Sequence, residues 1–158
     1  MRMADKLGEL QGFLRPMEAS AVVGEICRRL GEGHVAATGQ WGACGLALAA
    51  VVQKKLGRPI LVVTAHLDEA DDAADQLMFF RPGCDARLYP AFEVLPGESN
   101  VSDELAAQRL ELLVDLAGAG KGADFVVAPI QSLMQPSPGR ELLAELVMSL
   151  MWRLLAPE

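Results

Sequence analysis

Three glycines in a turn between a short apolar stretch and a predicted helix are the residues of this chain best suited to chemistry. Gly39 and Gly42 follow the apolar stretch at 34–38, and Gly45 lies at the start of the helix predicted over 43–55. A strand, a tight glycine turn and a helix in this order hold phosphate in many α/β proteins, because N–H groups at the helix start point at the anion. The sequence therefore predicts a nucleotide-type scaffold around this turn.

The side chains that complete such a site are missing from the turn. A working P-loop reads G-x-x-x-x-G-K-[ST], in which the lysine reaches the phosphates and the hydroxyl holds Mg²⁺. Counted from Gly39, Cys44 stands at the second glycine position, Gly45 at the lysine position and Leu46 at the hydroxyl position. The next lysine, Lys54, lies near the far end of the predicted helix. We expect a degenerate P-loop without a cofactor; an ordinary βα turn that never bound phosphate is the alternative.

The remaining polar residues form no catalytic pattern. The only Asp-Glu pairs, at 68–69 and 103–104, lie in first turns of predicted helices, whereas a helicase motor needs an acidic Mg²⁺ ligand at a strand end. Two histidines, His34 and His66, are too few and too isolated for a Ser-His-Asp or Cys-His arrangement. We therefore expect no catalytic residue and no metal site, so that this chain is not an enzyme.

Composition sets the class of protein. The chain has 158 residues, 51% of them hydrophobic, and a formal net charge of −7. It is long enough for one domain with its own core, and its acidity predicts weak or no binding to DNA. Three widely spaced cysteines match no zinc or disulfide pattern and indicate a reducing cytoplasm. The N-terminus has no apolar signal-peptide region, and the longest uncharged apolar run is too short to span a membrane.

Apolar periodicity places these residues on alternating helices and strands. Strands are predicted at 60–64, 86–89 and 125–130 besides 34–38, and further helices at 4–14, 17–30, 66–80, 102–116 and 140–155. This alternation indicates an α/β fold with a parallel sheet flanked by helices. The run Ile-Leu-Val-Val-Thr at 60–64 is typical of a strand that is covered on both faces.

One charged residue falls on the apolar side of a predicted helix. Arg109 lies among the apolar residues of the helix segment 106–117, and this position predicts a buried guanidinium. The guanidinium must also be paired, because an unpaired buried charge is very costly. Glu93 or Glu98 in the preceding loop is the expected carboxylate, and backbone carbonyls are the alternative. A role facing a partner protein is the other reading of Arg109.

Three motifs resemble one known family. The segments Tyr-Pro-Ala-Phe-Glu-Val-Leu-Pro at 89–96, Gln-Arg-Leu at 108–110 and Val-Val-Ala-Pro-Ile-Gln-Ser-Leu-Met-Gln-Pro at 126–136 resemble the N-terminal region of bacterial transcription-repair coupling factors. That region is similar to the first domain of the excinuclease protein UvrB, a degenerate, helicase-like RecA fold. The glycine turn fits, because the family's version has lost the phosphate-binding residues.

The resemblance implies a non-catalytic scaffold that helps couple stalled transcription to nucleotide excision repair. The implied partners are the other domains of the parent coupling factor. RNA polymerase and the excinuclease protein UvrA would bind only to modules that this chain lacks. The ATP-dependent motor is also expected in the missing part, so we expect a truncated product or a fragment. A small α/β nucleotide-binding protein and a stand-alone protein-interaction domain are the alternatives.

The C-terminal helix suggests a second unit. We expect the UvrB-like domain to span 1–139 and residues 140–158 to begin a following module. Leu146, Leu150 and Trp152 belong to a stretch, 142–155, that is apolar on nearly every side and has only a thin polar line. Such a helix is normally buried on several sides. We therefore expect self-association or docking through residues 142–155.

Overall fold

The computed structural model describes residues 12, 14–92, 102–119 and 122–146, and it confirms an α/β fold. Strands β1 (Ile60–Thr64), β2 (Ala86–Leu88) and β3 (Phe125–Pro129) form a parallel sheet in the order β1-β3-β2. Residue 60 of β1 and residue 86 of β2 both align with residue 125 of β3. β3 is central and buried throughout, which explains its uninterrupted apolar sequence.

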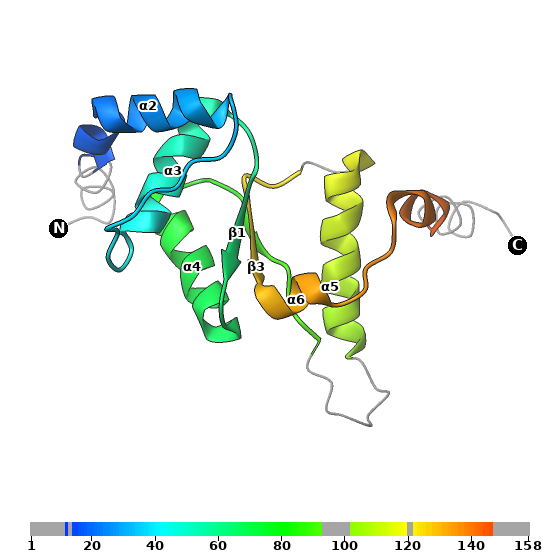
Figure 1. Ribbon diagram of the computed structural model, residues 1–158. Coiled ribbons are helices and arrows are strands. Elements are labelled where there is room, and N and C mark those ends of the chain that lie inside the picture. Colours follow the sequence, from blue (N-terminus) through cyan, green and yellow to red (C-terminus); the bar gives the residue numbers. More distant parts are fainter. Residues whose placement is uncertain (1–11, 13, 93–101, 120–121, 147–158) are drawn as a thin grey trace, which may run out of the picture.

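Two crossover helices lie on opposite faces of the sheet (Figure 1). Helix α4 (Leu67–Phe80) leads from β1 past β3 to β2, and α5 (Asp103–Val114) leads back from β2 to β3. Parallel crossovers are almost always right-handed, so two connections that run in opposite directions across a sheet place their helices on opposite faces. The sheet is therefore the middle layer of three.

The larger core lies on the α4 face. Helix α3 (Cys44–Leu56) packs beside α4, and α2 (Ala21–Leu30) packs on α3. The buried residues shared by α3, α4 and β3 are Ala50, Ala70, Ala73, Ala74, Leu77, Phe125 and Val127. The alanines let α3 and α4 approach each other closely, and the larger side chains fill the space against the sheet. The apolar spacing predicted for these helices is confirmed by this core.

The α5 face is covered only in part. Leu112 of α5 packs with Tyr89, Val126 and Ala128 over β2 and β3. The chain then passes through a π-helical turn, η1 (Asp115–Ala119), and after β3 enters a short helix, α6 (Ile130–Met134). Because α5 connects β2 to β3, it covers those two strands and leaves the corresponding face of β1 bare.

β1 therefore departs from its predicted environment. Leu61 and Val63 point to the α5 side of the sheet and are 54% and 48% exposed, whereas Ile60, Val62 and Thr64 alternate with them and are half-buried. The prediction that this strand is covered on both faces is wrong. A continuous apolar sequence does not distinguish a strand buried on two faces from one whose second face is open.

The strand predicted at 34–38 is also absent. Residues 34–40 have no regular secondary structure and, except for the half-buried Val35, are exposed. Two of the five residues, Ala36 and Ala37, have too little apolar area to hold a strand against the core by themselves. The helix that follows forms without it, because α3 packs directly on α4.

Smaller differences occur in the helices. The helix predicted over 17–30 is broken at residue 19, between a helical turn at 14–18 and α2. Val22 and Met78 are exposed on these helices, while their neighbours Val23 and Leu77 are buried. Helix α5 is followed by the π-helical turn at Asp115–Ala119, inside which Gly118 leaves the helical conformation at a φ of 103°.

A last helix begins at residue 140 and continues to 146, where the description ends. Leu143 is buried, and Leu142 and Leu146 are exposed. Leu150 and Trp152, and most of the apolar stretch 142–155, lie outside the described residues. In the described ranges, no helix is long and apolar enough to cross a membrane.

Candidate functional site

The glycine turn has a tight backbone that needs glycine at two positions. Gly39 and Gly42 have φ angles of 78° and 54°, in the left-handed region that favours glycine. Trp41 between them is 85% exposed. Gly45, in the first turn of α3, lies so near Gln40 that an added Cβ would be 2.9 Å from its Oε1 atom. The turn is thus specific in shape, although no strand leads into it.

The positions that would hold a nucleotide have other occupants. Leu46 at the hydroxyl position packs against the α3–α4 core, so it contributes to folding. Cys44 is an exposed free thiol, and Gly45 supplies no side chain. Lys54, ten residues beyond Cys44, forms a 2.7 Å ion pair with Glu18. The turn therefore offers backbone N–H groups but no positive side chain to a phosphate.

The most specific polar cluster in the described structure surrounds Arg109. Arg109 is 3% exposed, in agreement with the burial that its helix position predicts. Its guanidinium carbon lies 4.3 Å from the centre of the Tyr89 ring and 4.2 Å from that of Phe92. Both distances are within the range of cation–π attraction. The charge is thus held between two aromatic rings.

Hydrogen bonds occupy the guanidinium's edges. Nη1 donates to Gln135 Oε1 at 2.7 Å and to the Pro90 carbonyl at 3.2 Å. Nη2 donates to the Tyr89 hydroxyl at 2.7 Å and, at longer range, to the carbonyls of Ser132 and Pro136. Glu93 and Glu98, the carboxylates expected from the sequence, lie outside the described residues. In the described ranges, backbone carbonyls, a hydroxyl and an amide serve instead.

Gln135 ties the same two segments together a second time. Its Oε1 accepts a 2.8 Å hydrogen bond from the Phe92 N–H, and its Nε2 donates to the Phe92 carbonyl at 2.9 Å. One amide side chain therefore satisfies both backbone groups of Phe92, as a neighbouring strand would. We call Arg109, Tyr89, Phe92 and Gln135 the Arg109 clamp.

The fold brings the clamp together at the carboxyl end of the sheet. Tyr89 follows β2 and donates its N–H to the Val127 carbonyl at 2.8 Å, which extends the sheet by one residue. Ser132 in α6 is fully buried, and its hydroxyl donates to the Pro129 carbonyl at 2.8 Å. Arg109 projects from the middle of α5, near the buried Leu112. The clamp thus fixes the loop after β2 and the turn after β3 to one helix.

The sequence predicts the burial of Arg109 and, as one alternative, its pairing with backbone carbonyls, but not its side-chain partners. Tyr89, Phe92 and Gln135 are 20, 17 and 26 residues away along the chain, so no helical or strand periodicity links them to Arg109. The available signal was the pair of aromatic residues that flank Pro90-Ala91, since aromatic faces are common partners of buried guanidinium groups.

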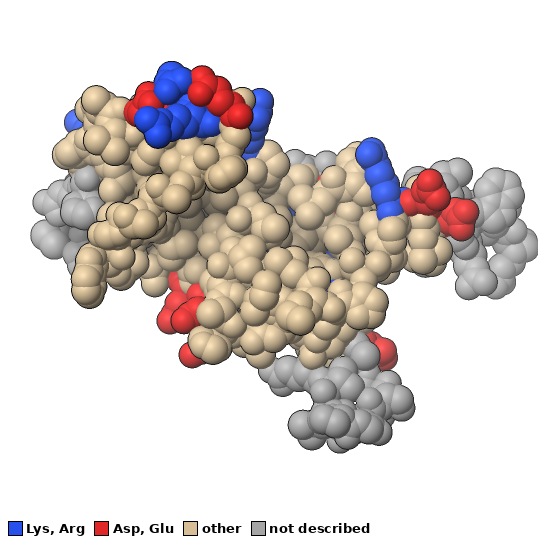
Figure 2. All heavy atoms as spheres, in the orientation of Figure 1, with Lys and Arg blue, Asp and Glu red and all other residues tan. Residues whose placement is uncertain are grey.

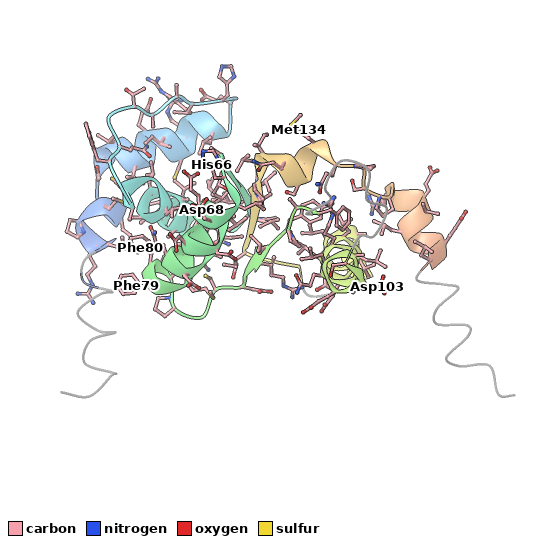
Figure 3. The ribbon with its side chains drawn as sticks, turned by 90° about the horizontal axis from the view of Figure 1, so that it is seen from below. His66, Asp68, Phe79, Phe80, Asp103 and Met134 are labelled. Atoms are coloured by element: carbon pink, nitrogen blue, oxygen red, sulfur yellow. The ribbon has the colours of Figure 1, made fainter. Side chains whose placement is uncertain are left out.

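His66 is the N-cap of α4, at the carboxyl end of β1. Glu69 accepts hydrogen bonds from the backbone N–H groups of Ala65 and His66, which closes a capping box. Figure 3 looks onto this end of the sheet and shows His66 and Asp68 at the start of α4 and Met134 on α6. Within the described ranges, no three His, Cys, Asp or Glu side chains form a metal-binding group.

Cations at the opposite end of the sheet are bound to acids. Arg87 pairs with Asp85 and Asp115, and hydrogen bonds to these carboxylates raise the pKa of the guanidinium. On α2, Arg28 and Arg29 both bond to Glu25, which lowers the pKa of that carboxyl to about 2. These paired cations form no free basic stripe.

Two comparisons with known proteins leave the chain without a family assignment. Models of known protein families give no match to the sequence, and a search of curated proteins gives no significant match.

Proposed function

We propose that this chain is a non-catalytic scaffold domain of the kind found at the N-terminus of bacterial transcription-repair coupling factors. The observation that carries this proposal is the Arg109 clamp. It joins the Tyr-Pro-Ala-Phe loop to the Pro-Ile-Gln-Ser-Leu-Met-Gln-Pro turn through the Gln-Arg-Leu helix. These are the three segments in which the sequence resembles that family, so their joint role is structural.

The glycine turn supports a role without chemistry. A RecA-like scaffold with a degenerate P-loop needs no lysine or hydroxyl at the turn, and Leu46 is used for core packing here. The clamp is also closed to ligands, because Arg109 is buried and both Nη1 and Nη2 donate to neighbouring groups. Rigid surfaces, rather than a reactive site, are what this fold can supply.

The proposed partners are proteins. In this proposal the domain packs on other domains of a coupling factor and restrains its motor, while RNA polymerase and the excinuclease protein UvrA bind to other modules. The net charge of −7 and the acid-paired arginines of α2 and β2 disfavour direct DNA binding. A cytoplasmic location belongs to the same proposal.

The test is to add the purified chain to a coupling-factor motor that lacks its own N-terminal region. We expect the chain to lower the motor's DNA-dependent ATPase rate in a saturable way, because a scaffold that restrains the motor should act when supplied separately. An unrelated acidic protein of similar size is the control. An ATPase rate that is the same with either protein would contradict the proposal.

A further inference from the structure

Exposed apolar residues lie at the carboxyl end of the sheet and on the bare face of β1, where the described part of the chain leaves them uncovered. Three of them lie on α6, one in the first turn of α4 and two on β1. They are Ile130, Leu133, Met134, Leu67, Leu61 and Val63, all of them at least 39% exposed. We call these residues the α6 surface. Met134, at 80% exposed, is its most accessible side chain.

The α6 surface rests on a fixed base. Ser132, on the inner side of α6, is fully buried and bonded to Pro129. Gln131 donates a 3.3 Å hydrogen bond to the Ala65 carbonyl, which links α6 to the end of β1. The Arg109 clamp holds the following residue, Gln135. A preorganised apolar surface binds a partner with little ordering cost.

Acidic side chains flank this surface on two sides. Asp68, Asp71 and Asp72 are exposed in the first turns of α4, and Asp103 and Glu104 are exposed in the first turn of α5. Figure 2 shows red atoms on both sides of the uncharged face over α6, and the largest group of blue atoms in this view lies over α2. Figure 3 shows Asp68 at the start of α4, Met134 on α6 and Asp103 at the start of α5.

We propose that the α6 surface is a docking site for a protein segment whose apolar side chains are flanked by lysine or arginine. Apolar contact with Met134, Leu133 and Ile130 would supply affinity, and methionine adapts its shape to such partners. The flanking carboxylates would select basic residues and speed association. The proposal deepens the scaffold function and rests on it for the choice of a protein partner.

Charge argues against two other occupants. A second copy of this chain would bring a net charge of −7 and the same acidic rim to the contact. Nucleic acid would place phosphates against the carboxylates of Asp68 and Asp103. A basic, apolar protein segment is the one class that matches both the uncharged centre and the acidic border.

The test uses a synthetic amphipathic peptide of leucine and lysine, about 18 residues long so that it can form a helix. The fluorescence anisotropy of this peptide is measured at increasing concentrations of the full chain. A leucine-glutamate peptide is the charge-reversed probe. We expect the lysine peptide to bind, its affinity to fall as salt is raised, and the glutamate peptide not to bind. No binding of the lysine peptide at about millimolar chain concentration would overturn the proposal.

A matched pair of variants locates the binding. Met134→Asp places a charge on the α6 surface, and Val22→Asp places the same charge on α2, where Val22 is 68% exposed. We expect the first variant to weaken binding by about tenfold or more and the second to leave it within about twofold. Equal effects of the two variants would show that binding is non-specific and would overturn the proposal that the α6 surface is a docking site. The scaffold proposal would still stand in that case if the chain lowers the ATPase rate of the motor.

Discussion

Arg109 is a buried cation that is stabilised without a described carboxylate. Two aromatic faces and several oxygen dipoles surround it, and each neutral oxygen gives up less solvation on burial than an ion would. The same oxygens belong to the loop after β2 and the turn after β3. The charge therefore stabilises one particular arrangement of two irregular segments, which apolar packing alone specifies poorly.

Replacing Arg109 should cost much of the domain's stability. We expect Arg109→Ala to lower the free energy of unfolding by about 2–4 kcal/mol, because it removes the donor to Gln135 and to the Tyr89 hydroxyl and empties the space between the rings. Arg109→Lys should recover little, since an ammonium lacks the planar fork. Urea unfolding of each variant gives the values.

Tyr89→Phe is the control for the clamp. It removes one hydrogen bond and keeps the ring, so we expect a loss of about 1–2 kcal/mol, smaller than that of Arg109→Ala. If Arg109→Ala unfolds at the same urea concentration as the natural chain, the clamp contributes no stability and our reading of it is wrong.

The difference between Arg109 and its partners shows what sequence can predict about a site. The burial of Arg109 follows from local spacing on a helix, which short-range geometry determines. Its partners Tyr89, Phe92 and Gln135 come from segments distant in the sequence, and only the tertiary fold brings them to it. Tertiary contacts of this kind leave no periodic signal in a single sequence.

At the scale of elements, two glycines in helical surroundings should respond to alanine in opposite ways. Gly24 lies inside α2 with no atom near an added Cβ, so Gly24→Ala should stabilise the domain by about 0.5–1 kcal/mol. Gly57 ends α3 at a φ of 62°, and its N–H donates to the Gln53 carbonyl at 2.8 Å. Gly57→Ala should destabilise it by about 1 kcal/mol. Thermal unfolding compares the two, and shifts of the same sign would refute the assignment.

Elements with strong, self-contained patterns were predictable, and elements that depend on a neighbour were not. β1 has the predicted bounds, and α4 and β3 have them to within a residue. Residues 34–38 were predicted as a strand but have no partner strand in the described structure, so they have no regular secondary structure and, except for Val35, are exposed. The bare face of β1 was missed for the same reason, because its cover depends on where α5 crosses.

At the scale of the molecule, the C-terminal helix is the expected cause of self-association. Leu142 and Leu146 are exposed on its described part, and the apolar sequence continues to residue 155. We expect the full chain to be a dimer or larger, or to precipitate, and a chain ending at Gly139 to be more soluble, because a large exposed apolar patch drives association. Light scattering during size-exclusion chromatography compares the two lengths. A monodisperse monomer at full length, with no gain on truncation, would show that the helix is satisfied within the fold.

In our proposal this molecule contacts protein partners through its surface and binds no nucleotide. Isothermal titration of the full chain with Mg-ATP tests it most directly, because Gly45 and Leu46 replace the lysine and the hydroxyl that a P-loop needs. We predict no measurable heat of binding. A saturable titration with micromolar affinity would contradict the account and assign the glycine turn a working nucleotide site.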